Sequence, residues 1–475
     1  MIVEGEGPGR LVDAATAPPA PCGPRAPAGV RRGHRRFFRR PGVHVPVTSG
    51  PLPRHAHRTW TGGTNTTTTD HDDFTVMDAA FKADAHARYA ELRARGPVHK
   101  AQILRGLDTW VVVDHDLAKI ALTHPALLKD ATPAADALEA VGFTAHRPES
   151  GLGANMLNAD PPDHTRLRGL VAAAFTRPRI EALRPRVAEI AEGLADAMAP
   201  LGAADLVRSF TGPLPVQVIS ELLGVPEEGR ASFRAWTSQA LGSKAEKQRE
   251  AFVSLNGYLA ELVAEKQRSP GDDLLSALTA VHDQRDGRLS MAELVGTANL
   301  LVVAGHDTTV NLLGNAMVAL LHRPEQARRL RERPELLPGA VEELLRFDPP
   351  VEFTPMRYAA EDITLGGARI PRGGTVVVAL TSVGRADPAM AAAERDVLDV
   401  GRPDVRHLSF GHGIHHCLGA PLARLEAEVG IGTLLRRFPD LATAVRPDDV
   451  PWIPVGLMRG PVSLPVTFTP VPATA

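Results

Sequence analysis

Cys417 is the residue whose surroundings indicate chemistry most directly. It lies in the segment 410–420, FGHGIHHCLGA, which leads into a helix-forming pattern with Pro421 in the first turn. A thiol at the start of a helix meets positive potential and free N–H groups, which favour the thiolate. The glycines of the segment have no side chains, so the backbone can pass close to a flat, bulky partner. The pattern predicts a thiolate metal ligand.

The cysteine content limits the alternatives. Cys22 is the only other cysteine, and it lies in a leader rich in Pro and Arg. Two such cysteines exclude a disulfide framework, and we therefore expect a reducing, cytoplasmic compartment. A lone cysteine without context is most often buried and inert, so this reading competes with the metal-ligand reading until the rest of the segment is considered.

A second polar feature interrupts an otherwise apolar helix. Ser290 followed by Glu293 has the form of a capping box, and the helix should run to about Leu321. At ~1.5 Å per residue its length is roughly 45 Å, enough to cross a whole domain. The helix is apolar on nearly every face, which predicts burial. The sequence HDTTVN in its middle argues against a membrane span.

Asp307 and Thr308 lie in this interruption. A buried carboxylate beside paired threonines costs free energy, unless the site needs protons or water. The alternative is a local bend, since a threonine hydroxyl can bond the carbonyl one turn back. From the residues alone, both readings stay open, and His306 receives no role.

Glu343 and Arg346 form a third pattern, three residues apart on a helix that ends before Pro349. Residues at this spacing share a helix face and can pair. An exposed pair of this kind is common and contributes little to stability. The pattern by itself therefore favours a solvated surface pair.

Composition describes a globular enzyme with a large core. The chain has 475 residues, 44% hydrophobic and 23% charged, with a net charge of −2. The near-neutral balance gives no support for nucleic-acid binding. Residues 1–72 are rich in Pro, Arg, Gly, His and Thr without periodicity, so we expect a disordered extension. No apolar stretch follows the arginine-rich part of this extension, which excludes an export signal and a membrane anchor.

The remaining pattern predicts a mainly α protein with small β-sheets. We expect a helix over 79–95, a strand over 109–115, a helix over 116–122, and a loop over about 131–153. Asp160 should cap a helix opened by two prolines. Glycine and proline turns predict strand–turn–strand pieces over 362–380 and 455–468.

These motifs together resemble the cytochrome P450 family. The spacing F-G-x-G-x-H-x-C-x-G is similar to the family's haem-binding signature, AGHDTT to its oxygen-binding helix, and Glu343/Arg346 to its E-x-x-R pair. The resemblance covers residues from about 73 to 470 in family order. It implies a single domain over 73–475, with haem b between the long central helix and the cysteine-loop helix.

The resemblance also implies roles for individual residues. Cys417 would ligate the iron, with Phe410 and Gly419 in its loop. Ala304 and Gly305 would leave room for dioxygen, Thr308 would hydrogen-bond the bound oxygen and Asp307 would supply protons. Glu343 and Arg346 would support the cysteine loop. The haem propionates would contact His164, Arg168, Arg357 and His415, and the pocket walls would include Val303, Val351, Glu352, Phe353 and Leu457.

The implied activity is monooxygenation, in which one oxygen atom of O2 enters a small organic substrate by hydroxylation or epoxidation. The residues of the motif segments are most similar to those of family members that tailor macrolides and other polyketides. If the Glu352 side chain faced into the substrate pocket, it would favour a substrate with a basic group, and Asn299 would be a second polar anchor there. Electrons would come from a separate ferredoxin and an NAD(P)H-dependent reductase, with Arg424, Arg436 and Arg437 as docking candidates. Two alternatives remain: a haem-free helper protein and a peroxide-driven enzyme.

Overall fold

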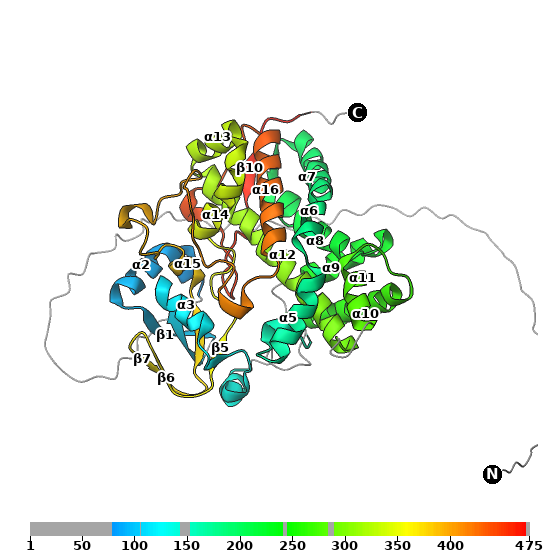
Figure 1. The fold of residues 1–475 in the computed structure, drawn as a ribbon. Helices are drawn as coiled ribbons and strands as arrows, with labels where there is room; N and C mark the ends of the chain where they lie inside the picture. The colour runs from blue at the N-terminus through cyan, green and yellow to red at the C-terminus, as the bar shows by residue number, and fades with distance from the viewer. Residues whose placement is uncertain (1–77, 105, 143–152, 241–244, 284–288, 472–475) are drawn as a thin grey trace, which may run out of the picture. The chain divides into compact units, whose positions relative to one another are not determined.

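Helices make up most of the chain that the structure describes (Figure 1). The computed structural model describes residues 78–104, 106–142, 153–240, 245–283 and 289–471. These residues belong to one compact unit, Thr69–Ala475. Cys22, the predicted extension 1–72 and the predicted domain start at residue 73 lie outside the described residues.

The helices are α1 (Ala79–Ala83), α2 (Ala85–Arg95), α3 (His115–Thr123), α4 (Ala135–Ala140), α5 (Asp163–Ala174), α6 (Arg177–Ala182), α7 (Arg184–Met198), α8 (Pro213–Leu222), α9 (Arg230–Ala240), α10 (Ala245–Arg268), α11 (Leu274–Asp283), α12 (Met291–Leu321), α13 (Pro324–Glu332), α14 (Leu337–Phe347), α15 (Leu380–Val383) and α16 (Ala420–Arg437). The strands are β1 (Val98–Leu104), β2 (Leu107–Val112), β3 (Leu127–Leu128), β4 (Ala203–Asp205), β5 (Arg357–Ala359), β6 (Ile363–Leu365), β7 (Ala368–Ile370), β8 (Thr375–Val378), β9 (Ala442–Thr443) and β10 (Pro465–Thr467).

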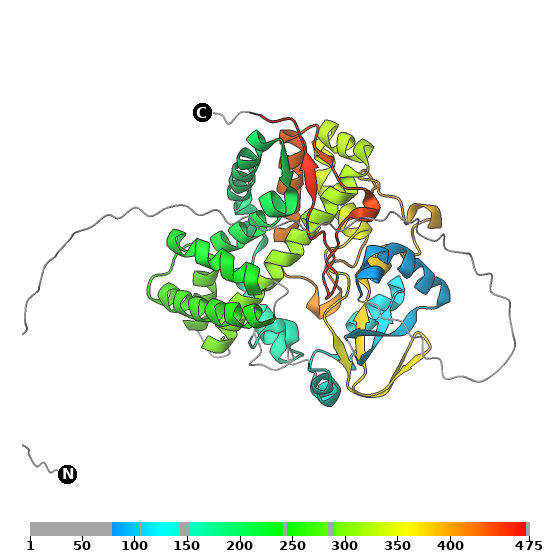
Figure 2. The ribbon, with the colours of Figure 1, turned by 180° about the vertical axis from the view of Figure 1, so that it is seen from behind.

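The long central helix α12 organises the helical part. The predicted capping box is present: Ser290 accepts from the Glu293 amide, and the Glu293 carboxylate accepts from the Ser290 amide. The helix ends at Leu321, where the sequence pattern predicted, and packs against α8, α10, α14 and α16. Seen from both sides, the helices α9 to α11 lie on one side of α12 and the strands β1 and β5 on the other (Figures 1 and 2).

Three small sheets complete the described part of the chain. The largest has the order β1-β2-β8-β5-β3, in which β2 and β8 are parallel and the other pairs antiparallel. A second sheet joins β4, β10 and β9, and a third is the β6–β7 hairpin. The prediction of a mainly α protein with small sheets is confirmed, as are the strand and turn pieces over 362–380.

The Glu343–Arg346 pair is buried, not a surface pair. Both side chains are 0% exposed, and the Arg346 Nε lies 2.7 Å from Glu343 Oε2. Arg346 also donates to the carbonyls of Gly384, Arg395 and Val397, and Glu343 accepts from Arg402. A buried pair of this kind is strongly destabilising to break, because the remaining charge is left uncompensated. The pair therefore ties α14 to the segment that leads into the cysteine loop.

The structure corrects four local predictions. The helix expected over 79–95 is two helices, since Asp84 ends α1 and precedes α2. The loop expected over 131–153 contains α4. Asp160 caps no helix, because its carboxylate accepts from the backbone amides of Lys129 and Asp130. Over 455–468 only β10 is a named strand, although Trp452 and Pro461 form an isolated bridge.

Within the described residues, no helix combines the length and the apolarity needed to cross a membrane.

Candidate functional site

The cysteine loop is closed by backbone contacts and leads directly into α16. The Cys417 amide donates to the Phe410 carbonyl over 2.8 Å. Gly411 and Gly413 have φ angles of 74° and 73°, which L side chains rarely adopt. A Cβ on Gly413 would also lie 2.7 Å from Thr123 Cγ2, so the glycine allows the loop to approach α3 closely. These contacts fix where the cysteine sulfur lies.

The thiol of Cys417 receives two backbone hydrogen bonds, from the amides of Gly419 and Ala420. Both lower its pKa, as predicted for a helix start. Burial has the larger effect, however, and the net pKa of the thiol is raised. Although part of the residue is exposed, the protein around the sulfur disfavours its anion, so the expected thiolate needs further compensation.

The polar interruption of α12 presents Ala304, Asp307 and Thr308 on accessible parts of the helix. Thr308 Oγ1 donates to the Ala304 carbonyl over 2.5 Å, which is the bond one turn back that the local-bend reading expects. Asp307 is about one-third exposed at 32%, and its Oδ1 lies 3.2 Å from His306 Nδ1. A carboxylate with this exposure can exchange protons with solvent.

Gly305 lies where α12 packs against α8. A Cβ at this position would meet Ile219 of α8 at 3.5 Å. The missing side chain therefore faces a neighbouring helix at ordinary van der Waals distance. That Ala304, which is exposed, and Gly305 leave room for dioxygen stays a prediction.

Four predicted basic residues converge beside the cysteine loop. The rings of His164 and His415 lie 4.2 Å apart. Arg168 donates to the His416 carbonyl over 2.6 Å, and Arg357 to the Leu127 carbonyl over 2.9 Å. Burial lowers the pKa of His415 to about 3, and the charges of Lys129, His164, Arg357 and Arg168 lower it further. Basic residues that repel one another in this way form a site suited to binding an anion.

Lys129 belongs to the same group, and sequence reasoning missed it. It is 7% exposed, and burial followed by the Arg357 charge lowers its pKa to about 7. Lys129 follows the two-residue strand β3 and precedes Asp130, a setting with no distinctive motif. Its one sequence signal is a lysine directly after an apolar strand.

The residues fit the haem that the resemblance implied. Both ring nitrogens of His164 and Nε2 of His415 are buried without a hydrogen-bond partner. Buried polar atoms rarely remain unsatisfied, so these atoms point to a bound polar group. Haem carries a metal that a thiolate can ligate and two carboxylates that such bases can pair with. The residues present therefore fit both the metal and the carboxylates of the cofactor.

The predicted substrate anchors, Glu352 and Asn299, bond to other residues of the chain. Glu352 is 0% exposed, lies 3.1 Å from Lys82 Nζ and accepts from Tyr89. Asn299 is buried and hydrogen-bonds to Asn256 and to the Val295 carbonyl. A carboxylate already neutralised by a buried lysine cannot serve a basic substrate, so the prediction that Glu352 and Asn299 face the substrate is wrong.

The other predicted pocket residues divide into two groups. Phe353 is 0% exposed and packs among Phe81, Tyr89 and Val377, so it is a core residue rather than a pocket wall. Val303, Val351 and Leu457 are half-buried, and Val351 forms a bridge with Met458. These three keep their predicted place as wall candidates.

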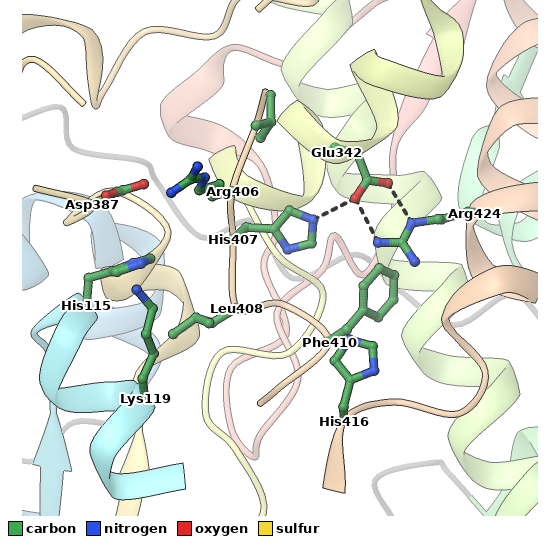
Figure 3. Close-up of a pocket in the computed structure, with 11 residues that line it drawn as sticks. His115, Lys119, Glu342, Asp387, Arg406, His407, Leu408, Phe410, His416 and Arg424 are labelled. Carbon is green, nitrogen blue, oxygen red and sulfur yellow. Dashed lines mark hydrogen bonds and ion pairs between the residues drawn. The ribbon is translucent and has the colours of Figure 1, made fainter. Parts of the chain in front are cut away.

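A surface pocket of about 330 Å³ lies beside the cysteine loop, lined by residues of α3, α14, α16 and the segment before Cys417 (Figure 3). His115 and Lys119 come from α3, and Arg406, His407 and Phe410 from the loop. Glu342 pairs with both His407 and Arg424, and the Arg424 guanidinium lies over the Phe410 ring. The apolar side chains of Ile120 and Ile414 are 53% and 50% exposed.

The three arginines predicted to dock a partner are engaged within the chain. Arg424 makes two hydrogen bonds to Glu342, Arg436 pairs with Glu192, and Arg437 pairs with Glu192 and Asp196. Lys119 and Arg406 line the pocket of Figure 3, whereas Arg436 and Arg437 do not. Arg406 is exposed, and the Lys119 side chain is 41% exposed and pairs with Asp116 of the same helix.

Comparison with known sequences agrees with the geometry. A cytochrome P450 family model matches residues 216–333 and 333–451. The cytochrome P450 monooxygenase PikC of Streptomyces venezuelae is 46% identical, over 83% of this chain and 94% of that protein. The 6-deoxyerythronolide B hydroxylase of Saccharopolyspora erythraea is 42% identical, over 82% of this chain and 96% of that protein.

Solved structures give the same result. The cytochrome P450 PksS of the bacillaene polyketide synthase of Bacillus subtilis is 37% identical, with a TM-score of 0.77 over 83% of this chain and 100% of that chain. The P450 monooxygenase TamI bound to tirandamycin C is 40% identical, with a TM-score of 0.75 over 82% of this chain and 99% of that chain. The chain therefore belongs to the cytochrome P450 family and is a haem-thiolate monooxygenase that binds haem b and inserts one oxygen atom of O2 into an organic substrate.

Proposed function

We propose that Cys417 is the residue through which this chain holds haem, and that the enzyme oxidises macrolide or polyketide substrates with electrons from a ferredoxin. The observation that carries the proposal is the sulfur of Cys417 at the start of α16, with two backbone amides directed at it. Haem, when bound, supplies the activation of dioxygen. The chain supplies the ligand, the orientation and the protons.

Proton delivery is the role that we propose for Asp307 and Thr308. A hydroxyl both donates and accepts, so Thr308 can pass a proton while its own hydrogen bond moves between the Ala304 carbonyl and a ligand. Asp307, one helical position before it and 32% exposed, connects this hydroxyl with solvent. The presence of this pair favours O2-dependent turnover over a peroxide-driven reaction, and Cys417 together with the pair argues against a haem-free helper.

The proposed propionate contacts are Arg168, Arg357, His164 and His415. The two arginines carry permanent positive charge, while the imidazoles offer buried nitrogens without partners. Phe410 and Gly419 support the ligand itself. Phe410 accepts from the Cys417 amide, and a Cβ on Gly419 would meet the sulfur at 3.8 Å.

The substrate class is proposed from two lines of support. Several relatives carry names that refer to macrolide or polyketide chemistry, including 6-deoxyerythronolide B hydroxylase and mycinamicin IV hydroxylase/epoxidase, at 42% and 40% identity. The wall candidates Val303, Val351 and Leu457 are apolar, as a large apolar substrate requires.

Electron delivery is proposed at the pocket of Figure 3. It lies beside the cysteine loop and is lined by Lys119 and Arg406. Ile120, the residue after Lys119 in α3, and Ile414 of the cysteine loop are exposed apolar side chains. An acidic ferredoxin would find charge complementarity and an apolar contact at one place. Such a pathway, with its NAD(P)H-dependent reductase, agrees with the cytoplasmic location proposed from the cysteine content.

We predict that Thr308→Ala keeps the optical spectrum but lowers the product formed per NADPH by about tenfold or more, because the proton relay loses its hydroxyl. The measurement is product, NADPH and hydrogen peroxide in one reaction, and peroxide release should rise by the amount lost from product. Thr308→Ser keeps the hydroxyl and serves as the matched control. Unchanged coupling in Thr308→Ala would remove this residue from the relay.

For the substrate class, we expect neutral macrolactones to convert the haem from low spin to high spin. The titration compares macrolactone aglycones, macrolides with an amino sugar, and saturated fatty acids. Because Glu352 is neutralised by Lys82, an amino sugar should change the affinity by no more than about tenfold, roughly 1.4 kcal/mol. A spin shift with fatty acids alone would contradict the macrolide proposal.

For electron transfer, the double variant Lys119→Glu/Arg406→Glu should raise the KM for ferredoxin by about tenfold at low salt, with the difference shrinking at high salt. The substrate-induced spin shift should stay unchanged. Arg234→Glu on α9 is the control for an exposed charge elsewhere. Equal KM values for the double variant and the wild type would place the docking surface outside this pocket.

A further inference from the structure

The pairing of β3 with β5 brings two cations to opposing positions. Leu127 pairs with Ala359 and Leu128 with Tyr358, where β3 ends. The same register continued by one residue sets Lys129 opposite Arg357, and the charge of Arg357 acts on Lys129. Like charges directly opposite each other on neighbouring strands are destabilising. Both side chains are also buried, at 7% and 6% exposed, where water screens their repulsion poorly.

The contacts of Lys129 leave one of its donors open. Its ammonium donates to the carbonyls of Pro355 and Met356, each over 3.0 Å. An ammonium has three N–H groups, and the described residues supply partners for two. The Lys129 side chain therefore lies against the segment that leads into Arg357, with one N–H available to a further acceptor.

The acids of the described residues do not balance these charges. Asp160 is the one carboxylate whose charge acts on Lys129, Arg357 and His164 together. Both of its oxygens accept from the backbone amides of Lys129 and Asp130. Among the described residues, no ion pair joins an acid to Lys129, Arg357 or Arg168. When Lys129 is protonated, three cationic side chains against one carboxylate leave about two positive charges, which is the charge that two carboxylates would neutralise.

We propose that Lys129 is a carboxylate-binding residue that pairs, together with Arg357, with a propionate of the haem. The inference rests on the proposed function, because it takes the anion to be that of haem. It adds a fifth base to the four that the sequence pattern indicated. Lys129 is a binding residue with no part in the oxidation itself.

A purely structural role makes a different prediction. If Lys129 only joined the carbonyls of Pro355 and Met356, a neutral amide donor at this position would be sufficient. If its charge pairs with a carboxylate, a neutral side chain of similar length fails even where it keeps those hydrogen bonds. Lys129→Gln therefore separates the two roles, and Lys129→Arg restores the charge.

The experiment follows haem transfer from the purified ferric holoenzyme to excess apomyoglobin. We expect Lys129→Gln and Lys129→Met to release haem about tenfold faster than the wild type, because one charge-assisted hydrogen bond is lost. Lys129→Arg should stay close to the wild type. The reduction potential should become more negative in the two neutral variants. Lys100→Met, which removes an exposed lysine of β1, is the control.

Reconstitution with haem dimethyl ester completes the test. The ester has no carboxylates, so the wild type and Lys129→Gln should then release it at equal rates. A wild-type release rate in Lys129→Gln, or a difference that persists with the ester, would overturn the inference. Even if Lys129→Met fails to fold, these comparisons with Lys129→Gln and Lys129→Arg decide the question. All folded variants should keep the red-shifted Soret band of the reduced carbon monoxide complex, whereas its absence in the wild type would instead refute the haem-thiolate proposal.

Discussion

The thiolate that we propose at Cys417 is the constraint on which the rest of the site depends. Burial raises the pKa of this thiol, although the amides of Gly419 and Ala420 act in the opposite direction. A thiolate here is therefore unfavourable unless a metal cation compensates it. The start of α16, the positive-φ glycines and the contact with α3 all fix the sulfur in one position. Through Gly384, Arg395 and Val397, the buried Glu343–Arg346 pair secures the chain segment before it.

A related electrostatic argument applies to the basic residues beside the cysteine loop. There the chain accumulates positive charge beside buried imidazole nitrogens that have no partners, and among the described residues Asp160 is the one carboxylate whose charge acts on Lys129, Arg357 and His164 together. Each part is unfavourable alone. A cofactor with a cationic centre and two carboxylates would relieve both, and the binding energy of haem and the stability of this region would then be coupled.

The sequence was informative where the signal is local. The capping box of α12, the end of that helix, the helix with Glu343 and Arg346, and the start of α16 follow from spacing within one element. Local patterns also identified Asp307, Thr308 and the cysteine loop, whose roles stay proposals. The fold class followed from the same periodicities together with the family resemblance.

The errors arose where the partner comes from a distant part of the chain. Glu352 was read as a substrate anchor because nothing near it in the sequence reveals Lys82 and Tyr89. Phe353 was read as a pocket wall because nothing near it in the sequence reveals its packing among Phe81, Tyr89 and Val377. Lys129 was missed for the same reason, since its significance appears only when β3 pairs with β5. The burial of Glu343 and Arg346 likewise needed the tertiary structure.

The most direct test of the central claim is the carbon monoxide difference spectrum of the reduced protein, recorded for the wild type and for Cys417→Ser. The account predicts a strongly red-shifted Soret band in the wild type, because the Cys417 thiolate would ligate the iron, and loss of that band together with monooxygenase turnover in the variant. A Cys417→Ser protein that keeps both the band and the turnover would contradict the account.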